Sequence, residues 1–517
     1  MTPDDQALDR LRRAARDLGR DLALGRSDAL ARVRATAPKP KGTPLKHADF
    51  LHVIAREEGF ASWPALKASV EMRGMDAAAR LQRLKIAIAH GQTHVIDRIL
   101  EDAPDLADGE FGLELALYRR DAVARALEAD PGMATRLIGL APPLVHLCQS
   151  RMIHHWPDKR NDMLAIAEML RLRGADLDFG PPAEKGSAHR LSPLYFALGH
   201  AGNLVLAEWL LDHGATPNDN ESLYHATELG HRDGLRLLLS HGADPKGTNA
   251  LLRAMDFGDV EAVAMLLEAG ADPNEGSDGR PAHGMAHGAC PALHQAARRM
   301  GDDRMAELLL AAGARPEATW NGISAYAYAR VYGNAALAAR LEGLGVDRSL
   351  AADEALLAAA AEGAVPGGRF LDPARLPEDF RTLPRQILNQ PGRLPHLKAL
   401  IAVGLEWDRP DSEGLTLVRV AGWEGLPEIM AWVLSLKPDL GHVNQYGGTL
   451  LTTIIHGSEN CPQRAERDHV ACARLALEEG VALPRKAISF AGEPAMAAFL
   501  DGWAEAHPGA VVEHGPI

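Results

Sequence analysis

Apolar and polar positions follow the same order in four neighbouring segments of the chain. The segments span 192–218, 221–246, 249–274 and 291–317, and each contains two apolar stretches separated by a short turn at Gly or Asn. The second stretch is the more apolar, as in Leu308-Leu309-Leu310. Each segment therefore predicts two helices of about ten residues. A single helical hairpin has no partner for its apolar faces, so the pattern predicts hairpins that stack and share a continuous core.

Glycine and proline mark the end of each predicted second helix. A Gly-Ala pair follows every second apolar stretch, and a proline stands three residues after the glycine. Glycine can adopt the left-handed conformation that ends a helix without a Cβ clash, and the proline prevents the helix from continuing. These residues are Gly214, Gly242, Gly270 and Gly313, with Pro217, Pro245, Pro273 and Pro316.

The four segments resemble ankyrin repeats, whose pattern reads TPLHxA, then a Gly, then LLLxxGAD. Residues 291–296, with the sequence PALHQA, are the nearest copy of the opening. The glycines at 214, 242 and 270 are 28 residues apart, whereas 33 residues is usual for the family. The missing residues fall where ankyrin repeats carry a β-hairpin finger, so the resemblance predicts that most fingers are trimmed.

Weaker copies extend the pattern from 81–108 to 448–483. We predict an all-α, ankyrin-type solenoid of helical hairpins with about twelve repeats. The repeat array is expected at 77–484, and 485–517 is expected to supply capping helices and a tail. Residues 1–70 do not follow the period. They include Gly59-Phe60 and Ser62-Trp63, and resemble a small helical module that precedes ankyrin arrays in bacterial proteins.

Composition narrows the possible classes of function. With 55 basic and 69 acidic residues the net charge is −14, which argues against binding to a nucleic-acid backbone. The four cysteines form no CxxC pair, the first residues lack the apolar centre of a signal peptide, and no apolar run has the length of a membrane helix. We expect a cytoplasmic monomer with a protein partner, without a cofactor, and without nucleic-acid or membrane binding.

The interval from Gly270 to Gly313 is lengthened to 43 residues and contains an insertion at 274–290. This insertion carries His283, His287 and Cys290, which are ligand types for Zn²⁺. Their spacing matches no standard zinc finger. Two interpretations stay open, a metal site and a binding loop that provides specificity.

Two other segments carry candidate histidines. The insertion at 151–162 contains His154, His155 and Trp156, which predict either a contact patch or a surface loop whose Trp packs on its own helices.

The second of these segments is 444–460, which contains Tyr446 and His456 as further candidate contact residues for a partner. Ser458 and Glu459 follow, so the segment includes residue types of a hydrolase triad, although no G-x-S-x-G elbow surrounds the serine.

The resemblance implies a scaffold that binds a protein in a concave groove and with its inserted loops. First helices and loop tips are expected to line the groove, because second helices use their surface for packing. Aromatic and Arg side chains dominate interface energetics, and the candidates are Tyr195, Tyr224, His225, Arg253, Trp320, Tyr326 and Tyr328. Two alternatives stay open. One is a metal-assisted or hydrolytic enzyme with a site in the His-rich loops, and the other is a toxin-neutralising or effector-type binding protein.

Overall fold

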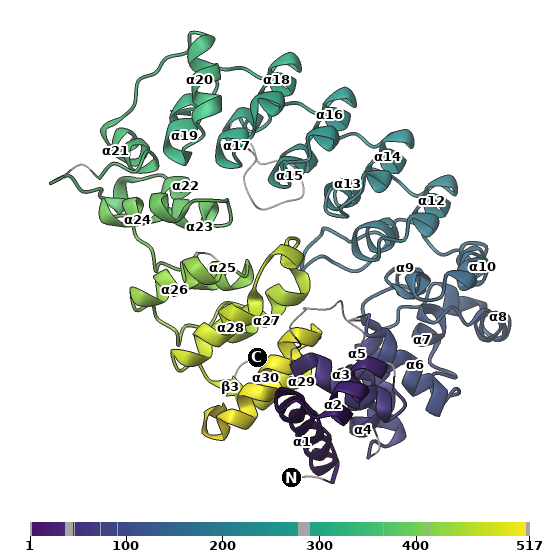
Figure 1. The fold of residues 1–517 in the computed structure, drawn as a ribbon. Coiled ribbons are helices and arrows are strands. Elements are labelled where there is room, and N and C mark those ends of the chain that lie inside the picture. Colours follow the sequence, from purple (N-terminus) through teal and green to yellow (C-terminus); the bar gives the residue numbers. More distant parts are fainter. Residues whose placement is uncertain are drawn as a thin grey trace. The chain divides into compact units, whose positions relative to one another are not determined.

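The computed structural model describes residues 3–36, 45, 47–60, 62–72, 74–89, 91–277, 290–365, 367–411 and 413–512. Helices dominate these residues and follow one another as hairpins (Figure 1). The predicted all-α fold of helical hairpins is therefore confirmed. The chain divides into two units. The first is Met1–Asp5 with Ala65–Ala325, and the second is Gln6–Pro64 with Tyr326–Ile517.

The first unit stacks helical hairpins in chain order. Its helices are α4 (Trp63–Met72), of which all but the first two residues belong to this unit, α5 (Ala77–Ala89), α6 (Thr93–Asp102), α7 (Phe111–Ala116), α8 (Arg120–Ala129), η1 (Pro131–Ala134), α9 (Pro143–Cys148), η2 (Met152–His154), η3 (Pro157–Lys159), α10 (Arg160–Arg171), α11 (Pro193–Tyr195), the π-helical η4 (Phe196–His200), α12 (Leu204–Asp212), α13 (Ser222–Ala226), α14 (Asp233–Ser240), α15 (Ala250–Asp256), α16 (Val260–Glu268), α17 (Ala292–Arg298) and α18 (Asp303–Ala311).

Local sequence explains why these hairpins form. The second helices α12, α16 and α18 begin at Asn203, Asp259 and Asp302, whose side chains accept a hydrogen bond from a backbone N–H of the first turn, as N-cap residues do. The glycines that follow the second helices have positive φ, 99° at Gly214 and 83° at Gly242. The helices therefore end where the Gly-Ala pairs predicted.

Packing places the first and second helices in separate rows. In Figure 1, α13, α15 and α17 stand in one row, and α12, α14, α16 and α18 stand in the other. Each of these second helices contains a fully buried leucine, for example Leu210, Leu238, Leu266 and Leu309. The stacked core predicted from the apolar runs is therefore present.

The described part of the chain forms a short finger between α18 and α19 (Ala325–Tyr332). Strands β1 (Thr319–Trp320) and β2 (Ile323–Ser324) pair antiparallel. Asn321 and Gly322 join them with φ of 52° and 77°, as two-residue hairpin turns of type I′ require. His294 of α17 donates from Nε2 to the Ile323 carbonyl over 3.0 Å. His294 is the histidine of the TPLHxA pattern, and it therefore fixes this finger to the preceding hairpin.

The second unit continues the hairpins and adds the first helices of the chain. Its helices are α1 (Pro3–Ala23), most of which belongs to this unit, α2 (Ser27–Thr36), α3 (His47–Glu57), α19, α20 (Ala335–Gly343), α21 (Ala352–Ala361), η5 (Pro373–Arg375), α22 (Glu378–Arg381), α23 (Leu383–Ile387), α24 (Leu394–Ala402), α25 (Leu417–Trp423), α26 (Pro427–Ser435), α27 (Leu450–Asn460), η6 (Arg464–Glu466), α28 (His469–Glu478), α29 (Arg485–Phe490), α30 (Pro494–Ala506) and η7 (Pro508–Ala510). Strands β3 (Leu483–Pro484) and β4 (Val511–Val512) pair parallel.

Within this unit α1 lies against α30 (Figure 1). Arg12 donates to the nearly buried Asp501 over 2.8 Å, and Arg16 pairs with Glu505. A Cβ at Gly19 would lie 2.9 Å from the Phe50 ring of α3, so α1 and α3 approach closely. Residues from both ends of the chain therefore share one core. The domain boundaries expected at 70 and 484 stay a prediction.

Candidate binding surface

Four of the sequence-predicted contact residues lie side by side on the first-helix row of the first unit. Tyr195 belongs to α11, Tyr224 and His225 to α13, and Arg253 to α15. The ring centroids of Tyr195 and His225 are 5.0 Å apart, and those of Tyr224 and His225 are 5.1 Å apart. The Arg253 guanidinium lies 5.4 Å from the centroid of Tyr224. These residues occupy equivalent places in successive repeats, which is why stacking brings them together.

Two glutamates of the α13 region bracket His225. His225 Nδ1 lies 2.7 Å from Glu228 Oε2, and its Nε2 lies 3.3 Å from Glu221 Oε2. Arg253 Nη2 reaches Glu228 Oε1 at 2.6 Å from the next repeat. Both His225 and Arg253 are therefore fixed by carboxylates.

The ion pairs continue beyond His225 in both directions. His189 Nε2 donates to Glu221 Oε1 over 2.6 Å. Asp256 accepts from Arg253 at 3.1 Å and from Arg299 at 2.7 Å. We name the resulting series the charge ladder, and it consists of His189, Glu221, His225, Glu228, Arg253, Asp256 and Arg299. The ladder links successive repeats along the row of first helices.

The ladder shifts the pKa of its central members. Burial lowers the pKa of His225, but the hydrogen bonds to Glu221 and Glu228 outweigh burial and raise the pKa to about 9. Burial raises the pKa of Glu221 and Glu228, yet the partnering histidines, and Arg253 at Glu228, bring both below the ordinary value. At neutral pH the imidazolium therefore stands between two carboxylates.

The insertion at 151–162 uses its histidines within the fold. His154 donates from Nε2 to the Ala201 carbonyl over 2.8 Å, and His155 Nε2 lies 2.8 Å from Asp97 Oδ2. The Trp156 ring is half-buried beside the His155 ring, with centroids 5.5 Å apart. These contacts fix the insertion to neighbouring repeats, and the contact patch stays a prediction.

The candidates Trp320, Tyr326 and Tyr328 come from the finger and from α19. Trp320 is half-buried in the finger, 5.9 Å from the Arg298 guanidinium. Tyr326 is buried and donates to Glu342 over 2.8 Å. Tyr328 is fully buried and donates to Asp379 over 2.8 Å.

Burial corrects the expectation that Tyr326 and Tyr328 contact a partner. The Tyr328 ring stacks on Tyr332 at 5.8 Å and packs against Phe380 of α22. Because α22 covers this side of α19, Tyr328 is part of the core, while Tyr326 is buried beside Glu342 of α20.

Segment 444–460 exposes Tyr446 and His456 and buries Ser458. Tyr446 is 70% exposed on the turn before α27. His456 is exposed on α27, accepts from Asn460 Nδ2 over 2.9 Å, and lies 5.0 Å from the Trp423 ring. Ser458 is buried, and its hydroxyl donates to the Ile455 carbonyl over 2.6 Å. Its hydroxyl is therefore occupied within the helix.

The candidate zinc ligands His283 and His287 lie outside the described residues. Cys290 is buried, and its thiol lies 3.8 Å from Gln295 Oε1. Within the described ranges no three His, Cys, Asp or Glu side chains gather as a metal site would require. Over the same ranges, no helix is both long and apolar enough to span a bilayer.

Sequence reasoning missed the acidic members of the surface and Phe257. Glu221 and Glu228 stand four residues before and three residues after His225, the spacing at which helical side chains meet. This spacing in the sequence could therefore have revealed that both glutamates contact His225. Phe257 follows α15, is 38% exposed, and lies 4.8 Å from the Arg253 guanidinium. It extends the aromatic row by one repeat.

Two ankyrin-repeat family models agree with the repeat pattern. A family model of ankyrin repeats in three copies matches residues 194–277, and a single ankyrin-repeat model matches residues 290–321. A crystal structure of an ankyrin repeat domain from Acinetobacter baumannii is 23% identical, covers 37% of this chain and 100% of its own, and has a TM-score of 0.28. No curated protein matches the chain.

Proposed function

The chain is an ankyrin-repeat protein, and we propose that it binds a protein partner through the first-helix face of its first unit. We define this face by Tyr195, Tyr224, His225, Arg253 and Phe257. One observation carries the proposal. Aromatic and cationic side chains from three successive first helices lie in contact and remain partly exposed.

The residue types and their rigidity support this role. Ankyrin repeats generally mediate protein–protein interactions, and Tyr and Arg are enriched among the residues that dominate binding energy. The ladder holds His225 and Arg253 in one arrangement before any partner arrives. Binding therefore loses less side-chain entropy than it would with free side chains.

The chemistry of the face favours aromatic packing and hydrogen bonds over net charge. The cations His225, Arg253 and Arg299 are balanced by the anions Glu221, Glu228 and Asp256. Within the described part of the chain, the hydroxyls of Tyr195 and Tyr224 make no hydrogen bond. We therefore propose a partner segment that packs on the rings and pairs its polar groups with these hydroxyls.

Capture followed by an affinity measurement tests the proposal. The immobilised full chain captures partners from lysate, and each enriched protein is then titrated against Tyr224→Ala and Arg253→Ala. Truncation at an interface centre is expected to weaken binding about tenfold or more.

Arg236→Ala is the matched control, because Arg236 lies on the second helix α14 with a side chain that is 60% exposed. A partner whose affinity is unchanged by both face variants, or is weakened equally by the control, would show that this face is not the binding site.

A further inference from the structure

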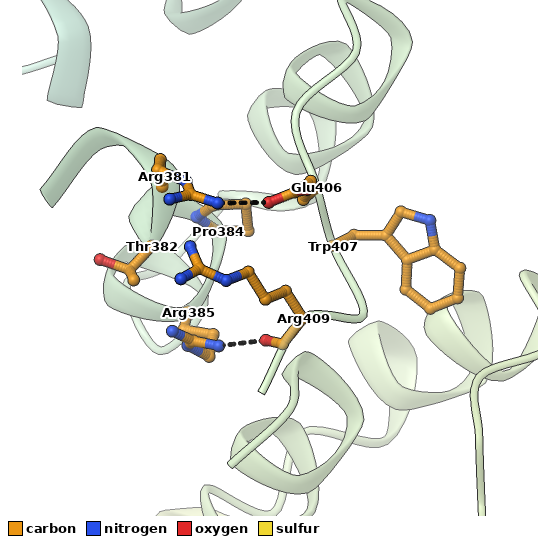
Figure 2. A pocket seen from close by; sticks show the side chains of 7 residues that line it. All are labelled: Arg381, Thr382, Pro384, Arg385, Glu406, Trp407 and Arg409. Atoms are coloured by element: carbon orange, nitrogen blue, oxygen red, sulfur yellow. Dashed lines mark hydrogen bonds and ion pairs between the residues drawn. The ribbon is translucent and has the colours of Figure 1, made fainter. Parts of the chain in front are cut away.

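Three arginine side chains line one hollow of the second unit (Figure 2). Arg381 ends α22, Arg385 lies in α23, and Arg409 lies in the loop after α24. Only about 10 Å³ inside the hollow is open to a water-sized sphere, so a ligand would lie at its open mouth, against the guanidinium groups. In Figure 2 the three guanidinium groups gather on one side of this loop, and the Trp407 ring points away from them. Charge, and not aromatic surface, therefore characterises the hollow.

Arg385 is the most buried of the three, with a side chain that is 12% exposed. Its Nη1 donates to the carbonyl oxygens of Arg409 and Leu415, the latter over 3.1 Å. The Asp411 carboxylate stays 3.9 Å from its Nε, and burial lowers the pKa of Arg385. The nearest carboxylate therefore compensates this charge only in part.

Arg381 and Arg409 also have donors that no carboxylate engages closely. Arg381 Nη2 lies 3.2 Å from Glu406, and its buried Nε has no hydrogen-bond partner among the described residues. Arg409 Nη1 lies 3.4 Å from Glu378. Charge-assisted N–H···O bonds are ordinarily about 2.7–2.9 Å long, so these pairs are loose.

Glu378 and Glu406 would compete with a ligand for these arginines. Each glutamate is more exposed than the arginine that it faces. The Glu378 side chain is 61% exposed and lies between Arg381 and Arg409, 3.9 Å and 3.4 Å away. Exposed pairs of this kind contribute little and are screened by salt. A ligand that carries two negative charges and several acceptor oxygens can therefore replace the glutamates at the guanidinium groups.

We propose that this hollow is an oxyanion site that binds a phosphate group, free or as a monoester. Arg381 and Arg385 supply donors held by α22 and α23, and Arg409 supplies a third donor from the loop. Guanidinium groups match phosphate oxygens with paired N–H donors. The site lies in the second unit and shares no residue with the first-helix face, so either proposal can fail without the other.

Calorimetric titration of the full chain at constant ionic strength tests the site with two probes, inorganic phosphate and O-phosphoserine. Arg381→Gln and Arg409→Gln are each expected to weaken binding about tenfold or more, because each removes a charged donor. Arg375→Gln is the matched control, since Arg375 is exposed on η5 and does not line the hollow. It is expected to leave binding unchanged.

Glu378→Gln gives a test that does not depend on loss of binding. Removing the competing carboxylate is expected to strengthen phosphate binding severalfold, a result that misfolding cannot imitate.

Saturation by inorganic phosphate alone assigns the site to a free anion, and saturation by O-phosphoserine assigns it to a monoester. Absence of binding for both probes up to about 10 mM, or equal weakening by Arg375→Gln, would overturn the proposal.

Discussion

Replacing His225 with Gln measures how strongly the charge ladder stabilises the first unit. Hydrogen bonds to Glu221 and Glu228 raise the pKa of His225 from 6.5 to about 9 despite its burial. Each unit of difference between the folded and unfolded pKa is worth about 1.4 kcal/mol, so protonated His225 contributes about 3 kcal/mol to folding. The lowered pKa values of both glutamates reflect the same contacts and are not added to this figure.

The sign of the pH dependence follows from the direction of the shift. Because the pKa is higher in the folded state, the contribution is complete below pH 6.5 and is lost as the pH rises through about 9. The difference in unfolding free energy between the wild type and His225→Gln is therefore expected to be larger near the low end of this window than above its high end.

Two measurements check this expectation. Exchange of the imidazole C2–H followed by mass spectrometry gives the His225 pKa in the folded protein. Denaturation monitored by amide hydrogen exchange in α13 gives the local stability, which suits a repeat array that need not unfold in one step. His231→Gln is the control, because that ring is 44% exposed. A His225 pKa at or below 6.5, or a stability difference that does not change with pH, would refute the reasoning.

Further substitutions test packing, ion pairing and thiol burial. Leu238→Ala is expected to cost about 2–5 kcal/mol in chemical denaturation, because the side chain is fully buried, and Leu239→Ala is expected to cost less because Leu239 is partly exposed. Arg12→Ala is expected to lower stability by about 3 kcal/mol, since its carboxylate partner on α30 is nearly buried. The more exposed pair of Arg16 is expected to contribute under about 1 kcal/mol in the same denaturation assay. Burial raises the pKa of Cys472 to about 12, so a thiol reagent is expected to modify this residue only after denaturant is added. Rapid labelling of the native chain at Cys472 would contradict its burial.

Local signals in the sequence were sufficient for the repeat fold. Turn glycines such as Gly214 and apolar runs such as the one at Leu238 act within one hairpin and its neighbours. The repeat therefore also brought Tyr224 and Arg253 together as expected, because equivalent positions of stacked hairpins are adjacent. The pair Asn321-Gly322 is a sequence signal for a hairpin turn, so the finger, which was not predicted, could have been found in the same way.

The incorrect site prediction arose from contacts distant in sequence. Tyr328 has the position of a surface residue on a first helix, but it donates to Asp379, 51 residues further along the chain. Asp379 lies on α22, in the stretch between α21 and α23, which no copy of the repeat covers. Periodicity therefore could not reveal that this side of α19 is covered.

The contact between α1 and α30 has a consequence for the order of folding during synthesis. Arg12 and Asp501 are 489 residues apart. At roughly 5–20 residues per second, a ribosome needs about 25–100 s to travel that distance. The hairpins of the first unit find their neighbours within tens of residues, whereas α1 and α3 have an uncovered surface until α30 has been synthesised. During that interval this surface is open to chaperones, proteases and non-native contacts.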